Sequence, residues 1–522
     1  MHHNDPSTGT FTLVGDELDL SLETGEVWWG GAVDDGGSMP FGAKPFTRDL
    51  APLPGTVERP PSNQAGPLLL SSTGRVVWSE RPFAFTVEPG RLRVSGRDLL
   101  LGRGGQNLRE AYLAAAQRFF PASGRTPARE LFTAPQYNTW IELPWAPTQD
   151  GVLAHVRALL DAGLPPGVVM IDDNWAPDHG TLVFDPARFP DPAAMVEQLH
   201  AWGCPVMLWV VPFVTPDSAT FRDLQDRGLL LRDAAGEVAV RRWWNGFSAV
   251  LDLSNPDAVG WFTGRLDALR ATTGVDGFKF DGGDARDFRL DDRTAEPAEP
   301  VDLTERWARV GLGFSFNEFR ACWRQGGQPL AQRLQDKPPS WGSDGLGSLV
   351  PELVAQGLLG YAFSCPDMVG GGEIGAVTGE VDQEFFVRYA QIACLAPMVQ
   401  FSVSPARVLD AEHLAAVHAA LALRAELLPL LLGLVQAAAT TGEPVVRAMA
   451  YHEPGTEHVS DQFLLGPDLL VAPVLERGAT HRDVVLPAGH WRGPDGTLFQ
   501  GPAQVRVVCD LRTVPRFARV AP

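Results

Sequence analysis

Hydrophobic and polar residues follow two different rhythms along the chain. In the first 130 residues, apolar and polar positions alternate in short segments that end at turn residues, as in TFTLVGDELDLSL from Thr10 and FAFTVEPGRLRVSG from Phe83. A period of two is typical of strands with one buried face. We therefore expect residues 1–130 to form an N-terminal antiparallel β-sandwich.

From Leu131 the rhythm changes to apolar runs separated by longer amphipathic segments. Helices are expected at 150–163, 191–203 and 255–274, since each segment reaches a glycine near its end. The predicted strands lie at 134–142, 168–173, 206–212, 278–281, 315–322, 331–336, 361–367 and 398–403. Eight β/α alternations over residues 131–438 predict an α/β fold of the (β/α)8 TIM-barrel type, with an open doubly wound sheet as the alternative. Residues 439–522 return to short alternating segments and predict a small C-terminal β domain.

Composition narrows the classes of partner. The chain has 522 residues and a formal charge of −20, which disfavours nucleic acid but is compatible with a neutral polyol. Its 15 tryptophans supply flat amphipathic faces of the kind that stack on sugars. The five cysteines are widely spaced with no CxxC pair, which argues against a disulfide framework or a zinc site. We expect no cofactor and no bound metal.

The N-terminal residues MHHNDPSTGTF lack the basic and apolar regions of a signal peptide. No apolar run approaches the roughly 18 residues that a membrane span needs. These features predict a soluble, cytoplasmic protein without a membrane partner. The oligomeric state stays open, a homo-oligomer included.

The stretch GVDGFKFDGGD, residues 274–284, concentrates candidate chemistry. Side chains alternate along a strand, so Lys279 and Asp281 share one face while Phe278 and Phe280 share the other. A neighbouring ammonium favours the ionised carboxylate that a nucleophile needs. A purely structural Lys–Asp pair is the alternative, although burying such a pair gains little stability.

Other predicted strands also end in acids. Asp172 and Asp173 follow the second strand, and Asp367 follows the seventh. In a barrel, the C-terminal strand ends line one mouth, so these acids would converge there; capping of the next helix or turn is the alternative. Asp344, in the loop SWGSDGLGSL, is the candidate second carboxylate, because an aromatic, partly desolvated loop raises the pKa of an acid. Taken alone, WGSDG also fits a turn with a helix cap.

A series of motifs carries a resemblance. IDDNW, FDPARFPDP, VMLWVVPF, RRWWNG, LDLSNPDA, GFKFDGGD, SWGSDGLGSL, CPDMVGGGE and MVQFSVSP follow one another between about Pro135 and Arg407. In this order they resemble glycoside hydrolase family 31, closest to its branch of α-galactosidases and myogenesis-regulating glycosidase. The resemblance implies retaining, exo-acting hydrolysis of an α-glycoside, with Asp281 as nucleophile and Asp344 as general acid/base, about 5–5.5 Å apart. It assigns sugar binding to Asp172, Asp173, Trp175, Trp209, Trp244, Lys279, Arg320, Trp341 and Asp367.

One departure bears on the sugar. Where family α-glucosidases carry a W-x-D-M-N-E segment, this chain reads KFDGGD, and its Lys279 resembles the α-galactosidase branch. Hydrolysis of α-glucosides, α-xylosides or sulfoquinovosides is the alternative within the family. Two further alternatives belong to other classes. One is a non-catalytic sugar-binding protein, and the other is a metal-dependent barrel with magnesium held by Asp172, Asp173, Asp281 and Asp284.

Overall fold

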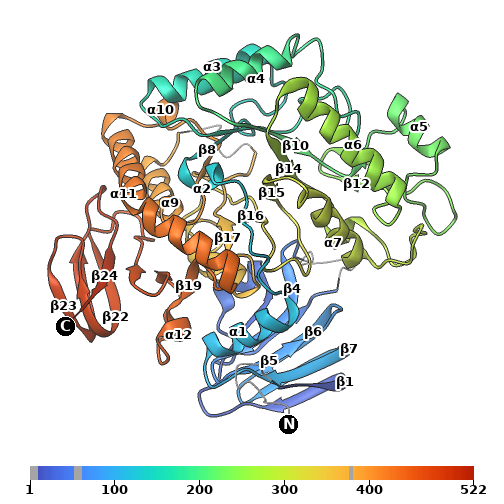
Figure 1. The fold of residues 1–522 in the computed structure, drawn as a ribbon. Coiled ribbons are helices and arrows are strands. Elements are labelled where there is room, and N and C mark those ends of the chain that lie inside the picture. The colour runs from blue at the N-terminus through green and yellow to red at the C-terminus, as the bar shows by residue number, and fades with distance from the viewer. Residues whose placement is uncertain (1–9, 52–61, 375–379, 522) are drawn as a thin grey trace.

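The computed structural model describes residues 10–51, 62–374 and 380–521. Its N-terminal part is an antiparallel β domain, drawn in blue in Figure 1. Within the described residues the sheet runs β2-β4-β5-β7-β6-β3, and β1 pairs along β7. Its strands are β1 (Thr10–Ser21), β2 (Trp28–Ala32), β3 (Phe46–Asp49), β4 (Ala65–Ser71), β5 (Arg75–Trp78), β6 (Phe83–Glu88) and β7 (Arg91–Arg103).

The period-two pattern is visible in this sheet. Along β6 buried and half-buried residues alternate, as the sequence predicts for a strand with one core face. The first part of the long strand β7 pairs with β6 and its last part with β5, so β7 connects both parts of the sheet. Helices α1 (Leu108–Phe119) and α2 (Glu130–Thr133) then lead into the central domain.

The central domain is a parallel barrel, and the predicted fold class is confirmed. In the described chain, the strand order is β17-β16-β15-β14-β10-β9-β8-β18. Backbone hydrogen bonds from Met398 N to Ser364 O and from Val369 N to Gln400 O join the two ends of this order. The strands are β8 (Gln136–Asn138), β9 (Val168–Ile171), β10 (Val206–Val210), β14 (Gly277–Phe280), β15 (Phe316–Phe319), β16 (Ala331–Arg333), β17 (Phe363–Cys365) and β18 (Gln400–Phe401). Each lies within a predicted apolar run or overlaps it closely.

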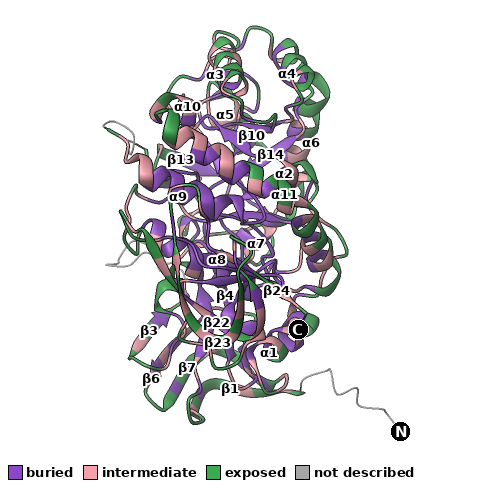
Figure 2. Ribbon diagram, turned by 90° about the vertical axis from the view of Figure 1, so that its left-hand side faces the viewer, coloured by how far each residue is buried: buried purple, intermediate pink, exposed green. Residues whose placement is uncertain are grey.

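Helices surround the barrel, and three of them match the predicted segments. These are α3 (Gln149–Asp161), α4 (Pro192–Ala201) and α6 (Pro256–Thr273). Asn255 accepts the first-turn N–H of Asp257, and Gly274 ends α6 in the left-handed region at φ 82°. The other helices are α5 (Ala219–Asp226), α7 (Pro300–Gly311), α8 (Leu349–Leu358), α9 (Gln383–Cys394), α10 (Pro405–Val408) and α11 (Ala411–Thr441). Figure 2 shows the buried residues concentrated where these helices meet the strands.

A small sheet that the sequence pattern did not predict follows β10. It has the order β11-β13-β12, from β11 (Phe213–Val214), β12 (Val240–Trp243) and β13 (Gly246–Val250). It lies at the C-terminal end of the barrel strands, where a TIM barrel carries its site.

Helix α11 is long and apolar. An 18-residue window within it has a mean hydropathy of 1.6, so its length and composition alone would allow it to cross a membrane, contrary to the expectation that no such run exists. About a third of that window is buried in the structure. Buried Arg424 donates hydrogen bonds to the carbonyls of Cys394, Ala396, Pro397 and Phe132, which fixes the helix to the barrel.

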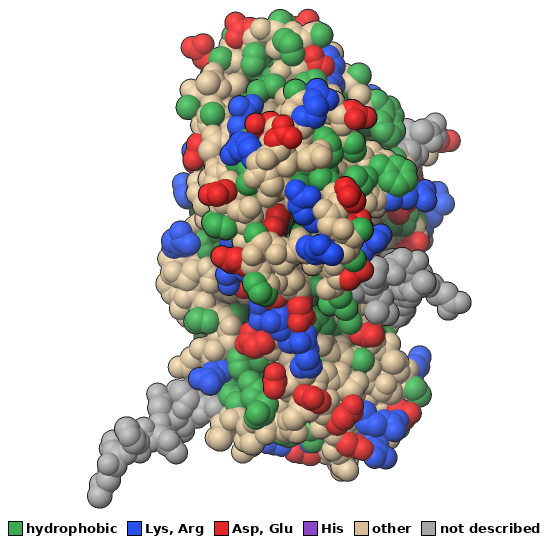
Figure 3. Space-filling view, turned by 90° about the vertical axis from the view of Figure 1, so that its right-hand side faces the viewer, with side chains coloured by type: hydrophobic (Ala, Val, Ile, Leu, Met, Phe, Trp, Pro, Cys, Tyr) green, Lys and Arg blue, Asp and Glu red, His purple; other side chains and the backbone are tan. Residues whose placement is uncertain are grey.

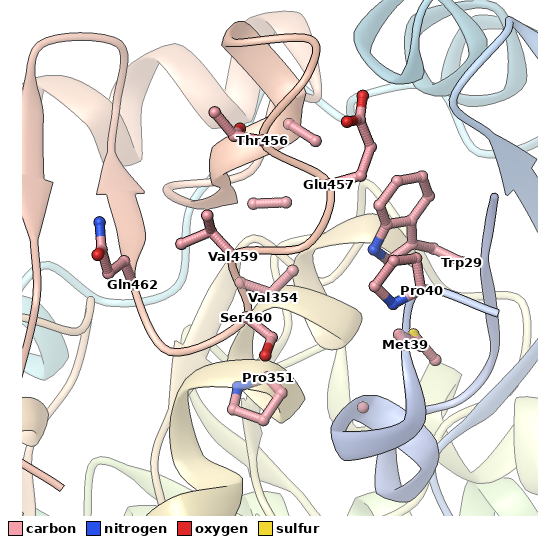
Figure 4. A pocket seen from close by; sticks show the side chains of 13 residues that line it. Trp29, Met39, Pro40, Pro351, Val354, Thr456, Glu457, Val459, Ser460 and Gln462 are labelled. Atoms are coloured by element: carbon pink, nitrogen blue, oxygen red, sulfur yellow. The ribbon is translucent and has the colours of Figure 1, made fainter. Parts of the chain in front are cut away.

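The C-terminal β domain has its own small core. Its strands are β19 (Val446–Ala448), β20 (Phe463–Leu465), β21 (Leu469–Val471), β22 (His481–Arg492), β23 (Leu498–Val508) and β24 (Arg516–Val520), and α12 (Met449–His452) follows β19. Figure 4 shows where this domain meets the N-terminal domain and α8, with Trp29, Val354 and Val459 around a small cavity. Its volume of about 20 Å³ leaves room for a water molecule and for no larger ligand. The junction is therefore packed as a structural contact.

One face of the surface shows how the charges are distributed. On the face shown in Figure 3, acidic and basic side chains lie interspersed. No broad single-sign field on that face would guide a charged ligand.

Candidate active site

Asp281 lies at the C-terminal end of β14, and its carboxylate is held from several sides. The indole Nε1 of Trp209, on the neighbouring strand β10, donates to Asp281 Oδ2 over 2.7 Å. The Lys279 Nζ lies 3.5 Å from the same oxygen. Oδ1 accepts the backbone N–H of Gly282 at 2.9 Å. The strand periodicity places Lys279 and Asp281 in the lumen, as predicted.

The opposite face of β14 packs outward. The Phe280 ring contacts Trp307 of α7 and stacks on Phe319 of β15, and Phe278 meets Phe314 edge-on. All of these side chains are buried. Because this apolar face of β14 packs outward, the opposite face, with Lys279 and Asp281, points into the lumen.

Electrostatics keep Asp281 ionised. Burial acts to raise the pKa of this carboxyl, but the charges of Lys279 and Arg320 and the Trp209 hydrogen bond outweigh it and lower the pKa to about 2. The pKa of Lys279 is raised, because the charges of Asp172 and Asp281 outweigh its burial. Asp281 is therefore a buried anion beside a buried cation, which suits a nucleophile better than an acid.

Arg320, at the end of β15, joins the same cluster. Its Nε lies 3.8 Å from Asp281 Oδ1 and 3.4 Å from Asp284 Oδ1, with no hydrogen-bond partner among the described residues. The guanidinium carbon lies 4.9 Å from the ring centre of Trp244, a cation–π contact. Trp244 is 43% exposed, so its ring is available to a ligand.

A residue of the N-terminal domain hydrogen-bonds to the backbone of this arginine. The side-chain amide of buried Gln64 donates to the backbone carbonyls of Arg320 and Arg333. The site thus depends on a residue of the β domain, which the sequence analysis did not identify.

Asp172 extends the cluster around the lumen. Its Oδ2 accepts from Lys279 Nζ at 2.8 Å and from the Asn138 amide at 2.9 Å. The network continues through Gln400, Glu318 and Arg333, linked by hydrogen bonds of 3.2, 2.7 and 3.3 Å in turn from Asn138. The sequence analysis missed Asn138, Glu318, Arg333 and Gln400. Each is a polar residue within a short barrel strand, and no motif in the sequence analysis marks it.

Asp367 terminates this network as a structural anchor. It pairs with Arg333 and accepts the backbone N–H groups of Lys337 and Gly372 at 2.6 and 2.7 Å. Burial, opposed by the charge of Arg333, raises the pKa of Asp367 to about 7. The carboxylate thus binds the backbone of two loops. Its contact with a sugar stays a prediction.

Asp173 has its own set of hydrogen-bond partners. Its carboxylate accepts from the backbone N–H of Asn174, from the Asn245 amide and from His179 Nε2. Asp172 and Asp173 are consecutive, yet among the described residues their carboxylates hydrogen-bond to different side chains. His179 and Asn245 are further residues that the sequence analysis missed, since both come from loops without a regular period.

Asp344 has surroundings unlike those expected from its sequence. It lies in the loop between β16 and a 3-10 turn at Leu346–Ser348, exposed to solvent, and its Oδ1 accepts from the Ser340 hydroxyl at 2.9 Å. The expectation of a partly desolvated loop is therefore wrong for this structure. Trp341 turns to the protein instead, where its indole donates to Asp382 and its ring meets Phe385 edge-on.

Trp175 supports another tryptophan. It is 2% exposed, and its indole N–H is already used by the backbone carbonyl of Trp209 at 2.7 Å. Its assignment to sugar binding stays a prediction, while its hydrogen bond holds β10, the strand whose Trp209 indole donates to Asp281.

The four carboxylates proposed for magnesium do not gather around one point. Asp172 and Asp281 flank the Lys279 ammonium. Asp173 accepts from His179 and Asn245, and Asp284 pairs with Arg286 and Arg320. Across the described ranges, no three His, Cys, Asp or Glu side chains are grouped to hold a metal ion. The positively charged side chains of Lys279, Arg286 and Arg320 already pair with three of these carboxylates. The donor set therefore does not fit the metal-dependent alternative.

Two family models match the chain. Residues 135–317 match the glycosyl hydrolases family 31 TIM-barrel domain, and residues 442–520 match the glycosyl hydrolase family 31 C-terminal domain. The chain belongs to glycoside hydrolase family 31.

Individual relatives agree with this membership. The myogenesis-regulating glycosidase of Mus musculus is 37% identical over 409 residues, which cover 76% of this chain and 57% of the relative. An α-xylosidase of Lactiplantibacillus pentosus is 26% identical over 74% of this chain and 54% of its own length. The chain thus spans about half the length of these curated relatives. Among solved structures, a family 31 dextranase of Flavobacterium johnsoniae complexed with glucose shares the fold, with a TM-score of 0.83, 18% identity, and coverage of 97% of this chain and 67% of that one.

Proposed function

We propose that this protein is a retaining, exo-acting α-glycoside hydrolase of the α-galactosidase type. The observation that carries the proposal is the buried Asp281 carboxylate, held ionised between Lys279, Arg320 and the Trp209 indole at the mouth of the barrel. Family membership supports the reaction class, and the relatives named above include glycosidases.

In the first step, Asp281 attacks the anomeric carbon. A new C–O bond to the carboxylate forms as the bond to the leaving oxygen breaks, and Asp344 gives its proton to that oxygen. In the second step, Asp344 takes a proton from water, and the water oxygen displaces Asp281 with a second inversion. This route requires the two carboxyl groups about 5–5.5 Å apart in the working complex.

Because Asp344 is exposed, the proposed mechanism requires the bound substrate to shield it from water. A general acid needs a pKa near the working pH, and removing water from a carboxyl raises its pKa. The solvent-exposed loop acquires such surroundings when the leaving group covers it. Protonation is thereby coupled to the presence of a complete substrate.

Lys279 is the basis for choosing galactose. Its ammonium has three donors, of which one binds Asp172 at 2.8 Å and another faces Asp281 at 3.5 Å. In the proposed complex the third donates to a ring hydroxyl, and a polar contact of this kind discriminates strongly between epimers. The α-xylosidase relative supports the alternative, a different sugar on the same machinery.

A panel of aryl α-glycosides tests the proposal. We expect the α-galactoside to be cleaved fastest, and NMR of the first-formed product should show the α-anomer. Faster cleavage of the α-xyloside or α-glucoside would move the protein to the alternative sugar, and a β-anomer product would refute retention.

A further inference from the structure

Two neighbouring barrel strands lose their pairing beside the reaction centre. β15 pairs with β14 over four residues, whereas in the described chain it pairs with β16 at one position, Phe319 opposite Gln332. In this parallel register the next pair would be Arg320 opposite Arg333. Both arginines therefore stand where the backbone ladder between the two strands has ended.

A glutamine side chain from the N-terminal domain lies at this position. Gln64 directly precedes β4 and is 1% exposed. Its Nε2 donates to the carbonyl of Arg320 at 2.8 Å and to that of Arg333 at 2.5 Å. A side-chain amide has two N–H donors, so this one group binds both strand ends at once. With the amide reversed, Oε1 would face two carbonyl oxygens, so the acceptors determine its orientation.

Gln64 is itself held by both domains. Its carbonyl accepts the backbone N–H of Val33 in the N-terminal domain at 2.9 Å, and its backbone forms a parallel bridge with Cys322 of the barrel. The amide of Gln356, a buried residue of α8, donates to Gln64 Oε1 at 3.4 Å and to the Gln332 carbonyl at 3.3 Å. The N-terminal domain thus reaches the ends of β15 and β16 through one fixed side chain.

The two arginines act on the nucleophile through their charges. Arg320 Nε lies 3.8 Å from Asp281 Oδ1. Burial raises the pKa of Asp281, and the charge of Lys279 lowers it. The charges of Arg320 and Arg333 lower this pKa further. The other charged side chains paired within this cluster are Asp172, Asp284, Arg286, Glu318, Asp336 and Asp367.

We propose that Gln64 is a positioning residue of the reaction, which binds the main chain of Arg320 and Arg333 and so holds their charges beside Asp281. The N-terminal β domain then contributes to catalysis through the strand ends of the barrel. This inference rests on the proposed function and extends the catalytic machinery from the barrel to a second domain.

The variant Gln64→Met tests the proposal. It removes both N–H donors and keeps the length of the side chain. We expect kcat/KM to fall about 10- to 100-fold, because small displacements of positioned groups cost rate of this order. The acid limb of kcat/KM against pH should move upward, since burial then raises the pKa of Asp281 against a weaker opposing charge. An acid limb that stays in place would overturn the proposal, whatever the loss of stability.

Gln391→Met is the matched control. Gln391, on α9, is 2% exposed, and its Nε2 donates to the Leu511 carbonyl of the C-terminal domain at 2.8 Å. This variant also removes a buried amide donor that joins two domains, so denaturant unfolding should show a comparable loss of stability. We expect it to keep the kcat/KM and the acid limb of the wild type. Equal shifts in both variants would assign the effect to general destabilisation and overturn the proposal.

A second substitution decides the matter if Gln64→Met does not fold. Gln64→Asn keeps a polar amide but shortens the side chain by one methylene, so it no longer reaches both carbonyls. We expect the acid limb to move in the same direction as predicted for Gln64→Met. Wild-type kinetics and an unshifted limb in Gln64→Asn would overturn the proposal.

Hydrogen exchange gives a readout that does not need turnover. The amides of Arg320 and Leu334 donate to the carbonyls of Phe280 and Cys365 at 3.4 and 2.9 Å. In either Gln64 variant, peptides covering residues 320–334 should exchange about tenfold faster than in the wild type, and Gln391→Met should leave them unchanged. If the wild type cleaves no aryl glycoside, the proposed function fails, and this measurement alone decides whether Gln64 holds the strand ends. Equal exchange in wild type and variant would refute that role.

Discussion

The two carboxylates assigned to catalysis have contrasting environments. Asp281 comes directly after a barrel strand, is 6% exposed, and is held by an indole, a backbone N–H and two cations. Asp344 comes from a loop, is exposed, and accepts from the Ser340 hydroxyl. In the proposed mechanism, the nucleophile is therefore held ready by the folded protein, whereas the acid gains its surroundings only when the substrate binds.

The largest expected effect is that of replacing Asp281. Asp281→Asn should lower kcat/KM by about 10⁴-fold or more, because the proposed mechanism forms its covalent intermediate on this carboxylate. Asp276→Asn is the matched control, since Asp276 lies at the other end of the same strand and pairs with His200 at 2.8 Å. Steady-state kinetics of both purified variants check the contrast. Comparable losses in the two would mean that position 281 is only structural.

The second-largest expected effect is that of replacing Asp344. Asp344→Ala should lose about 10²–10⁴-fold on an unactivated disaccharide and far less on an aryl glycoside with an activated leaving group, which needs little protonation. Both substrates are measured on the same enzyme preparation, so altered folding cannot mimic the difference. An equal loss on both would remove the acid role from Asp344.

The third prediction tests how Asp281 is kept ionised. The pKa of Asp281 is about 2, below its ordinary value, so the nucleophile stays ionised down to low pH. Lys279→Met removes a charge that lowers this pKa and leaves burial to raise it, so the acid limb of kcat/KM against pH should move upward. Activity at pH 7 should fall on the order of 100-fold.

Its control is another buried lysine. Lys337 pairs with Glu352 at 2.6 Å, so Lys337→Met also breaks a buried ion pair and should lower the free energy of unfolding by a few kcal/mol. It should leave the acid limb where it is in the wild type. A limb that shifts equally in both variants would attribute the effect to general destabilisation.

The same lowered pKa predicts a contribution to stability. A carboxyl with a depressed pKa in the folded state stabilises the protein above its ordinary pKa, and this contribution is lost as the pH falls toward the folded value. Asp281 should therefore contribute stability above about pH 4 that disappears toward about pH 2. Denaturant unfolding of wild type and Asp281→Asn across this range should converge at the acid end. A constant difference across the range would contradict the depressed pKa.

The smallest effect concerns the exposed edge of the site. Trp244→Ala removes the ring under the Arg320 guanidinium, a contact worth about 0.5–1 kcal/mol at an exposed position. We expect kcat/KM to fall about two- to fivefold, mainly through KM. Exposed Trp145 offers a comparison, because Trp145→Ala should change neither parameter.

The contrast also explains what could be predicted from the sequence. Strand periodicity gave the orientation of Lys279 and Asp281, and phenylalanines on the other face confirm it through their packing. The surroundings of Asp344 could not be predicted, because a loop has no period and its exposure depends on distant contacts. Likewise, Gln64 and Asn245 reach the site from a separate domain and from an inserted sheet, and no local pattern marks such contacts.

Trapping the covalent intermediate tests the central claim most directly. The protein is incubated with a fluorinated glycosyl fluoride that forms the intermediate quickly and releases it slowly, and the labelled peptide is mapped by mass spectrometry. The account predicts one glycosyl unit on Asp281. A label on any other residue, or an active enzyme that never becomes labelled, would contradict it.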